Sequence, residues 1–353
     1  MDKNQLRQYL LQAINMALDS DGTETSYTNS FDIQILDNGF NWIPRIPSSF
    51  VINFDLYQKI YEIANLALYP EFSVLKMNNM YIVPLSNEDI HIKRSLFFPW
   101  VKGIPERLVL HNEEHQDNPQ HYINLMKDLN ISYDKVTSIA IAGNSGSGKS
   151  YFLNYLLNSI HNFSDLIIID PKMDSPSRWA RANKVKAIIP DANRSKADYV
   201  GRINEVLSNA LKLIHARQEQ IFVNPNIKFR PNTIAIDEIL ALTEGLPKAM
   251  KSSFDALISQ IALLGRSSNF HLLLVSKRLD HTTLPTSVRE QANVLVQLGN
   301  INSRTTQFLF PDLDPRGIVI PLGKGTGLIQ IIDPDYPAQV LPFLAPTYHE
   351  RTC

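Results

Sequence analysis

The sequence contains almost no cysteine and no long apolar run, and both absences limit what the protein can be. Its single cysteine, Cys353, is the last of 353 residues, so no disulfide can form within the chain, which suits a reducing cytoplasm. The longest apolar runs, such as 166–169 and 272–275, are too short to cross a bilayer. Residues 1–22 have the spacing of an amphipathic helix with Asp and Asn among the apolar positions, which is not the pattern of a signal peptide.

The chain also has almost no net charge, because an acidic part and a basic part of the sequence nearly cancel each other. Residues 1–130 hold 10 basic and 16 acidic residues, a net charge of -6, whereas residues 131–353 hold 24 and 19, a net charge of +5. The sharpest basic concentration, at 172–202, is as often a plain solvated face as a binding surface. The total of -1 therefore does not exclude a DNA-binding protein. We expect any DNA contact within 131–353 and a protein partner or a docking role for the first 130 residues.

The apolar patterning predicts two domains. Residues 1–130 combine short apolar alternations with helical segments at 1–18, 56–68 and near 120–129, which indicates a small α+β domain. In residues 131–353, strands are expected at 138–142, 166–169, 233–236, 271–275, 294–296 and 327–332, and helices at about 149–161, 196–222 and 247–265. Short apolar strands that alternate with helices favour an α/β fold with a central, mostly parallel sheet covered on both faces.

A glycine-rich segment follows the first of these strands and opens the next helix. It fits the pattern G-x-x-x-x-G-K-[ST], in which glycines let backbone N–H groups surround a phosphate. The lysine reaches the β- and γ-phosphates and the last serine binds Mg²⁺. The expected nucleotide-binding residues are Gly143, Asn144, Ser145, Gly146, Ser147, Gly148, Lys149, Ser150 and the adjacent Tyr151. ATP and Mg²⁺ are the expected cofactors.

Two carboxylates follow the strand at 233–236. Asp237, at the strand end, can bind the Mg²⁺ together with Ser150, and Glu238 can orient and deprotonate the attacking water. A strand followed by paired acids is common by itself. Combined with the upstream phosphate loop, it favours ATP hydrolysis, with Glu238 and Lys149 as the catalytic residues.

Several ordered segments together resemble the FtsK/SpoIIIE DNA translocases, within the FtsK–HerA group of P-loop ATPases. They cover about residues 137–333. They are the phosphate loop, Ile169-Asp170-Pro171-Lys172, the strand that ends in Asp237-Glu238, the stretch Gly265–Arg278, and the segments Asn302–Thr305 and Gly323–Gly325.

The resemblance implies a RecA-like core, a homo-hexameric ring and ATP-driven movement along double-stranded DNA. It also implies an arginine that reaches the ATP of a neighbouring subunit, for which Arg266, Arg289 and Arg304 are the candidates. Ser276 and Lys277 are the candidate γ-phosphate sensors. The family usually has Gln where this chain has Lys277, which puts the trigger chemistry in question.

Two hypotheses of function remain open. The leading one is an ATP-dependent DNA translocase. Because the sequence shows neither a membrane segment nor a sequence-reading DNA module, we expect a role in plasmid or mobile-element transfer as a conjugative coupling ATPase, or in DNA segregation. The expected location is cytoplasmic, with recruitment to a membrane by a relaxase or a transfer apparatus. The alternative is an ATP-binding assembly or regulatory protein that hydrolyses slowly and does not translocate.

One competing motif is present. His111-Asn112-Glu113-Glu114-His115 fits the pattern H-x-x-E-H of an inverted zinc-protease site, with His121 as a third possible ligand. That motif requires a helix, and this stretch runs into Pro119 through turn-forming residues. A solvated polar loop is therefore the favoured interpretation.

Overall fold

The computed structural model describes residues 2–19, 30–45, 52–86, 89–110, 121–280, 282–332 and 339–348. The chain divides into two compact units. The first holds Met1–Pro105, Asp312–Ile320 and Ala338–Pro342, and the second holds Glu106–Pro311, Pro321–Pro337 and Phe343–Cys353. The sequence analysis placed its boundary at residue 130 instead. Among the described residues, no helix is long and apolar enough to span a membrane.

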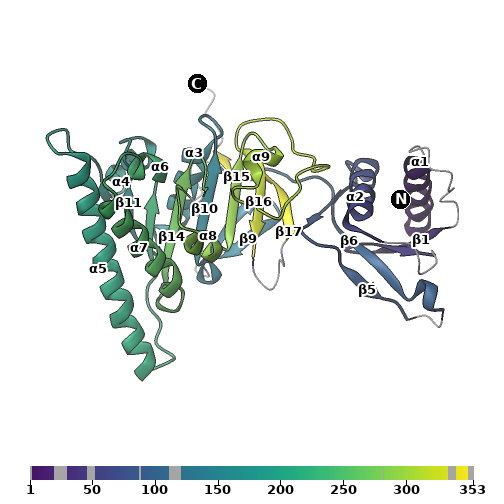
Figure 1. Ribbon diagram of the computed structural model, residues 1–353, viewed down its shortest axis with the longest axis horizontal. Helices are drawn as coiled ribbons and strands as arrows, with labels where there is room; N and C mark the ends of the chain where they lie inside the picture. The colour runs from purple at the N-terminus through teal and green to yellow at the C-terminus, as the bar shows by residue number, and fades with distance from the viewer. Residues whose placement is uncertain are drawn as a thin grey trace. The chain divides into compact units, whose positions relative to one another are not determined.

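The first unit combines an antiparallel sheet with two helices. The strands of the sheet are β1 (Phe31–Leu36), β2 (Gly39–Pro44), β3 (Phe72–Val74), β5 (Ile82–Pro84) and β6 (Arg94–Lys102), with a short 3-10 turn at Ile90–Ile92. A further strand, β4 (Lys76–Met77), pairs instead with β17 (Gln339–Leu344). The sheet order is β1-β2-β6-β3, and β5 also pairs with β6. The helices α1 (Lys3–Asp19) and α2 (Phe54–Leu68) contact each other and cover one face of this sheet (Figure 1). Period-two alternation turns Phe31 and Ile33 of β1 into the core.

The second unit contains a mostly parallel sheet, which confirms the predicted α/β class. Its strands are β10 (Ser138–Gly143), β11 (Asp165–Ile169), β12 (Lys186–Ile188), β13 (Asn232–Ile236), β14 (Phe270–Ser276), β15 (Val294–Leu298) and β16 (Thr326–Ile331). Their order is β12-β11-β13-β14-β10-β15-β16. All pairs are parallel except β15 with β16. The strands are apolar along their length because both faces are covered.

The helices of this unit lie on both faces of the sheet. They are α3 (Lys149–Ile160), α4 (Ser175–Ala182), α5 (Lys196–Val223), α6 (Ile239–Thr243), α7 (Lys248–Leu264), α8 (Thr286–Gln291) and α9 (Ser303–Thr306). The chain moves outward from β10 to β12 and then back from β12 to β14. Because parallel crossovers are right-handed, this reversal places α3 and α4 on one face and α5 and α7 on the other. Accordingly, α3 packs on α4 and α5 packs on α7 (Figure 1).

The prediction of a helix near 120–129 is wrong. These residues form β8 (Tyr122–Met126) and β9 (Leu129–Ser132), an antiparallel pair. Ile123 and Leu125 are fully buried, and the intervening Asn124 is less so, which is the period of a strand. The segment is too short for a strand period to be told from a helical one by apolar content alone. Smaller elements complete the unit: β7 (Val109–Leu110) pairs in parallel with β18 (Thr347–Tyr348), and Tyr133–Lys135 forms a 3-10 turn.

The topology gathers the polar strand ends at one edge of the sheet. Parallel strands point their carboxyl ends to the same edge, so the residues after β10, β11, β13 and β14 meet there. Between β10 and β13 lies only β14. The glycine-rich loop and the paired acids, far apart in sequence, are therefore brought to neighbouring positions.

Candidate functional site: a nucleotide loop facing two carboxylates

The glycine-rich loop connects β10 to α3 in the way that the sequence predicts. Gly148 caps the helix in the left-handed region, with φ of 102°, which favours glycine. The Lys149 side chain turns back into the loop, where Nζ donates to the carbonyl oxygens of Gly143 at 2.6 Å and Asn144 at 3.0 Å. Burial lowers the pKa of Lys149, while Glu238 and Asp237 oppose that change.

The loop rests on two other glycine segments. The N–H of Gly325 donates to the carbonyl oxygen of Ser147 at 2.9 Å. A Cβ atom on Gly299 would stand 2.9 Å from the Cβ of Ser147. Arg107 in turn supports the Gly325 turn, donating to the carbonyl oxygens of Lys324 at 2.7 Å and Ala345 at 2.6 Å. The sequence analysis missed Arg107, since nothing in its local pattern marks it.

The loop residues fit a phosphate group. The Ser147 hydroxyl is buried beside Gly143 and has no hydrogen-bond partner within the described structure, so it would have to turn outward to donate to a ligand oxygen. The first turn of α3 adds backbone N–H groups and the positive end of a helix. Tyr151 is 80% exposed in that turn, where its ring can stack on a base.

The two acids follow β13 directly, at the same edge. Asp237 is 6% exposed, and burial, followed by the charges of Asp170 and Glu238, raises its pKa to about 6. Its own N–H donates to the carbonyl oxygen of Ile169 at 2.9 Å. A buried carboxylate with raised pKa gains from a divalent cation, so Asp237, with Ser150, fits the Mg²⁺ role predicted for it.

Glu238 is held by contacts from both sides. Its backbone lies in the left-handed region with φ of 53°, which is uncommon for a residue with a Cβ. Oε2 lies 2.7 Å from Nζ of Lys172, and Oε1 accepts from the N–H of Lys277 at 3.2 Å. The sequence marks Lys172 only as part of the segment Ile169–Lys172, and no local pattern predicts this ion pair.

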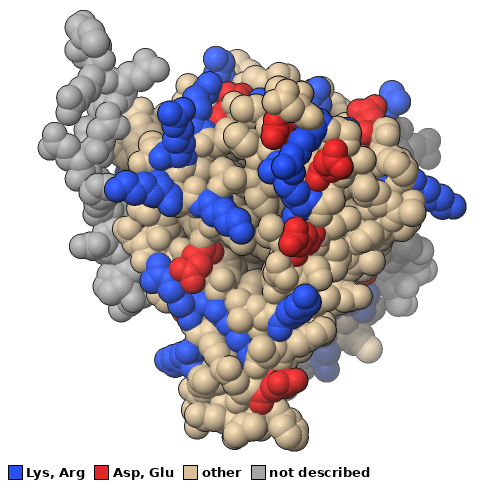
Figure 2. All heavy atoms as spheres, turned by 90° about the vertical axis from the view of Figure 1, so that its left-hand side faces the viewer, with Lys and Arg blue, Asp and Glu red and all other residues tan. Residues whose placement is uncertain are grey.

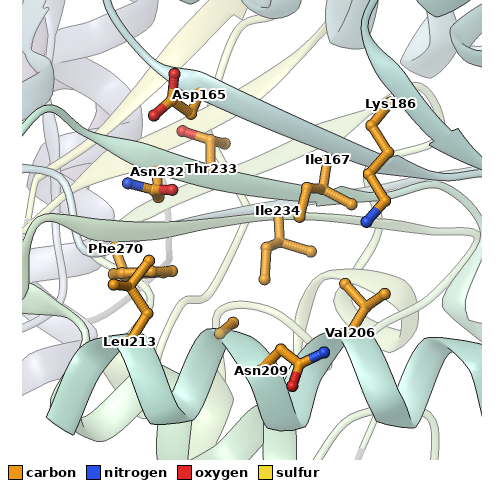
Figure 3. A pocket seen from close by; sticks show the side chains of 11 residues that line it. Asp165, Ile167, Lys186, Val206, Asn209, Leu213, Asn232, Thr233, Ile234 and Phe270 are labelled. Carbon is orange, nitrogen blue, oxygen red and sulfur yellow. The ribbon is translucent and has the colours of Figure 1, made fainter. Parts of the chain in front are cut away.

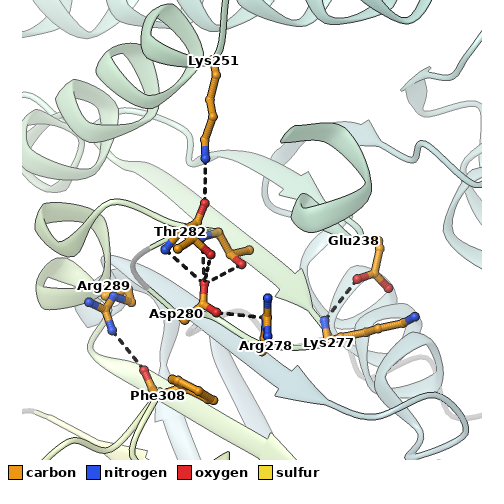
Figure 4. Close-up of polar contacts among 9 residues, drawn as sticks. Glu238, Lys251, Lys277, Arg278, Asp280, Thr282, Arg289 and Phe308 are labelled. Atoms are coloured by element: carbon orange, nitrogen blue, oxygen red, sulfur yellow. Dashed lines mark hydrogen bonds and ion pairs between the residues drawn. The ribbon is translucent and has the colours of Figure 1, made fainter. Parts of the chain in front are cut away.

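Lys277 links the acids to the nucleotide loop through its backbone (Figure 4). Its N–H donates to Glu238, and its carbonyl oxygen accepts from the N–H of Gly143 at 3.3 Å. The preceding Ser276 is fully buried, and its hydroxyl has no partner within the described structure. Both sensor candidates therefore lie between the loop and Glu238.

The three arginine candidates lie in different places. Arg289 is bonded inside its own chain: it donates to Phe308 O at 3.1 Å, as Figure 4 shows, and to Thr286 Oγ1 at 3.2 Å. Arg304 is exposed and lines a pocket of about 260 Å³ beside the chain's own Gly143. Arg266 is exposed just before β14, at the sheet edge opposite the loop.

A further pocket of about 230 Å³ lies between α5 and the sheet, away from this site (Figure 3). Its lining includes Asp165, Asn232 and Phe270, which begin β11, β13 and β14. These are the strand ends opposite the nucleotide loop, so the pocket plays no part in the site.

The zinc-protease motif at 111–115 lies outside the described residues, whereas His121 is described. Its Nδ1 lies 2.9 Å from Asp134 Oδ1, and its ring stacks on Phe163. The described ranges contain no cluster of three or more His, Cys, Asp or Glu side chains that could hold a metal ion.

Comparison with known proteins agrees with this geometry. Residues 127–262 match the family model of the helicase HerA central domain. The FtsK domain-containing protein YdcQ of Bacillus subtilis (strain 168) is 24% identical over 200 residues, which are 54% of this chain and 40% of YdcQ. Both matches are similarities to the FtsK–HerA group of P-loop ATPases, the group whose motifs the sequence resembles. The chain thus spans well under two thirds of YdcQ.

Two solved structures share the fold of this chain. The pCW3 conjugation coupling protein TcpA, solved as a monomer with ATPγS, has a TM-score of 0.53 at 15% identity, covering 96% of this chain and 95% of TcpA. The cytoplasmic domain of EssC has a TM-score of 0.50 at 11% identity, covering 94% and 62%. The likeness is in fold, and it agrees with the RecA-like core that the sequence analysis expected.

Proposed function

We propose that this chain is an ATP-driven motor that moves along double-stranded DNA. The observation that carries the proposal is the backbone of Lys277, which contacts Gly143 of the nucleotide loop and the carboxylate of Glu238. One residue thus couples the group that binds phosphate to the group that activates water. Any displacement of the loop after β14 changes both at once.

The residues support a simple hydrolytic step. Lys149 and the loop N–H groups bind the β- and γ-phosphates, and Tyr151 stacks on the base. Glu238 accepts a proton from a water molecule, whose oxygen forms a bond to the γ-phosphorus as the bond to the β–γ bridging oxygen breaks. Ser150 and Asp237 would hold a magnesium ion, which would neutralise charge on the triphosphate.

Two observations support double-stranded DNA as the polymer along which the motor moves: the similarity to HerA and the net positive charge of residues 131–353. The region similar to HerA, residues 127–262, lies almost entirely within the part of the sequence, 131–353, that carries a net charge of +5. Sequence-independent grip on a duplex needs only basic residues that face the phosphate backbone. We also propose a homo-hexameric ring, in which the exposed Arg266, remote from its own chain's loop, reaches the ATP of a neighbour.

Transfer of plasmid or mobile-element DNA is the proposed setting, with DNA segregation as the other one considered. TcpA is described as a conjugation coupling protein, and its fold matches this chain over 96% of the length. In that setting the motor works in the cytoplasm and receives DNA from a relaxase or passes it to a membrane transfer apparatus. The acidic residues 1–130 are the part of the chain that we propose for such a partner.

Turnover with and without duplex DNA tests the proposal. We expect duplex DNA to raise kcat for ATP, with an effect that weakens as salt increases. Glu238→Gln should lower turnover by orders of magnitude while ATPγS still binds, and Glu219→Gln, on the exposed face of α5, should change neither. If kcat for ATP is the same with and without duplex DNA at every salt concentration, the alternative of an ATP-binding assembly protein is favoured instead.

A further inference from the structure

Lys172 forms an ion pair with Glu238, the carboxylate proposed as the general base. Nζ of Lys172 lies 2.7 Å from Oε2 of Glu238, whose side chain is only 7% exposed. The other carboxylate oxygen accepts from the N–H of Lys277. Both oxygens of Glu238 are therefore engaged by the protein itself, which fixes the direction of the carboxylate and leaves fewer lone pairs to bind the attacking water.

The position of Lys172 is fixed by the turn that carries it. Asp170 follows β11 and is fully buried. One of its carboxylate oxygens accepts from the N–H of Lys172 at 2.9 Å, and the other accepts from Asp174 at 2.8 Å and Ser177 at 3.2 Å. Asp170 thereby ties the Lys172 turn to the start of α4. Movement of α4 would be transmitted to the ion pair on Glu238.

The same segment continues into exposed basic residues. Arg181, Lys184 and Lys186 follow within and after α4, are exposed, and form no ion pair with the described residues. Figure 2 looks onto the side on which α4 and α5 lie in Figure 1, and Lys and Arg side chains are spread across it with fewer acids among them. The Lys172 side chain is itself 45% exposed, so an anion can reach it from solvent.

We propose that Lys172 is a positioning residue that restrains Glu238, and that a backbone phosphate of duplex DNA relieves this restraint by competing for Lys172. The inference rests on the proposed function and adds a mechanism of regulation. ATP hydrolysis stays slow until DNA binds the basic segment that contains Lys172, Arg181, Lys184 and Lys186. When Lys172 turns to the phosphate, Oε2 of Glu238 becomes free to accept the proton of the attacking water.

The test compares Lys172→Met, Lys172→Arg and Lys212→Met, the last being an exposed lysine on α5. We expect Lys172→Met to raise kcat without DNA about tenfold, the effect of losing one charged hydrogen bond, with KM for ATP unchanged. Duplex DNA should then add little. Lys172→Arg should keep the low DNA-free rate because guanidinium also pairs with a carboxylate, and Lys212→Met should behave as the unaltered protein.

Binding gives an independent readout. The slope of log affinity for duplex DNA against log salt concentration, measured without nucleotide, should fall by about 0.9 in Lys172→Met, because one phosphate contact is lost. An unchanged slope would overturn the role of DNA.

The kinetic outcomes separate the remaining interpretations. A lower kcat with a raised KM in Lys172→Met would mean that Lys172 binds ATP rather than restraining the base, and would overturn the proposal. A raised DNA-free rate that duplex DNA still stimulates by the original factor would overturn the link to DNA. If the unaltered protein shows no DNA stimulation, the proposed function fails, while the DNA-free rate of Lys172→Met still decides whether the restraint exists.

Discussion

The N–H of Gly325 donates to the carbonyl oxygen of Ser147 at 2.9 Å, so a turn late in the chain supports the nucleotide loop. Arg107 holds that turn through the carbonyl oxygens of Lys324 and Ala345. We expect Arg107→Ala to raise KM for ATP several-fold and to lower the free energy of unfolding by about 1–2 kcal/mol. Arg230→Ala is the control, because it breaks an exposed pair with Asp165 at the opposite sheet edge. Equal ATP affinity in both variants would show that the support is unnecessary.

Close packing behind the loop gives a second prediction. Gly299 and Gly245 both have positive φ, of 78° and 73°, so alanine strains the backbone at either site. Only at Gly299 would the new Cβ meet the loop, 2.9 Å from Ser147 Cβ, whereas Gly245 has nothing within 4 Å. Titration with a fluorescent ATP analogue should show weakened binding in Gly299→Ala and not in Gly245→Ala. Matching losses would mean that backbone strain alone is responsible.

The sequence was sufficient to place those candidate site residues that are contiguous in the chain. The loop 143–150 and the acids Asp237 and Glu238 are marked by spacing and by the strands before them, and parallel strands necessarily bring their ends together. Arg107 and Gly325 could not be found in this way. Their roles depend on contacts with residues far away along the chain, such as Ala345 and Ser147, which leave no local pattern.

One element and one contact of the structure differ from the sequence-based predictions, and each difference has its own physical cause. The hairpin of β8 and β9 was mistaken for a helix because a five-residue strand offers too few alternations to reveal its period. The contact between Lys172 and Glu238 was missed because an ion pair between two strand ends depends on the direction of side chains. The order of strands alone does not give that direction.

The buried His271 predicts loss of stability in mild acid. It is 1% exposed, and burial lowers its pKa to about 4, although its Nδ1 contacts the carbonyl oxygen of Val136. Below about pH 6.5 the His271 side chain binds a proton in the unfolded chain but stays neutral in the folded chain. The free energy of unfolding therefore falls as the pH drops from about 6.5 toward 4. Urea unfolding should show about 2 kcal/mol less stability from this group at pH 5 than at pH 7.

The control for that measurement is a histidine outside the core. His271→Phe should be less stable at pH 7 but should lose less between pH 7 and pH 5. His161→Gln, at the end of α3, should keep the pH dependence of the unaltered protein. An unchanged slope in His271→Phe would assign the acid sensitivity to other groups.

The ring proposal predicts complementation between subunits. Arg266→Ala and Lys149→Ala should each lose most DNA-stimulated turnover when tested alone. In a mixture, an intact Lys149 site on one subunit meets an intact Arg266 from its neighbour, so part of the activity should return. Arg289 is bonded within its own chain, so Arg289→Ala should keep its turnover when tested alone, and its mixture with Lys149→Ala should show no more activity than the sum of the two separate proteins. No recovery in the mixture of Arg266→Ala with Lys149→Ala would exclude Arg266 as the residue shared between subunits.

Displacement of a third strand from duplex DNA tests the central claim most directly. A linear duplex carries a short triplex-forming oligonucleotide at a fixed distance from one end, and its release is followed after ATP is added. The account predicts release that requires ATP, that is delayed further as the intervening duplex lengthens, and that Lys149→Ala and Glu238→Gln abolish. DNA-stimulated hydrolysis that leaves the third strand in place would contradict a translocating motor.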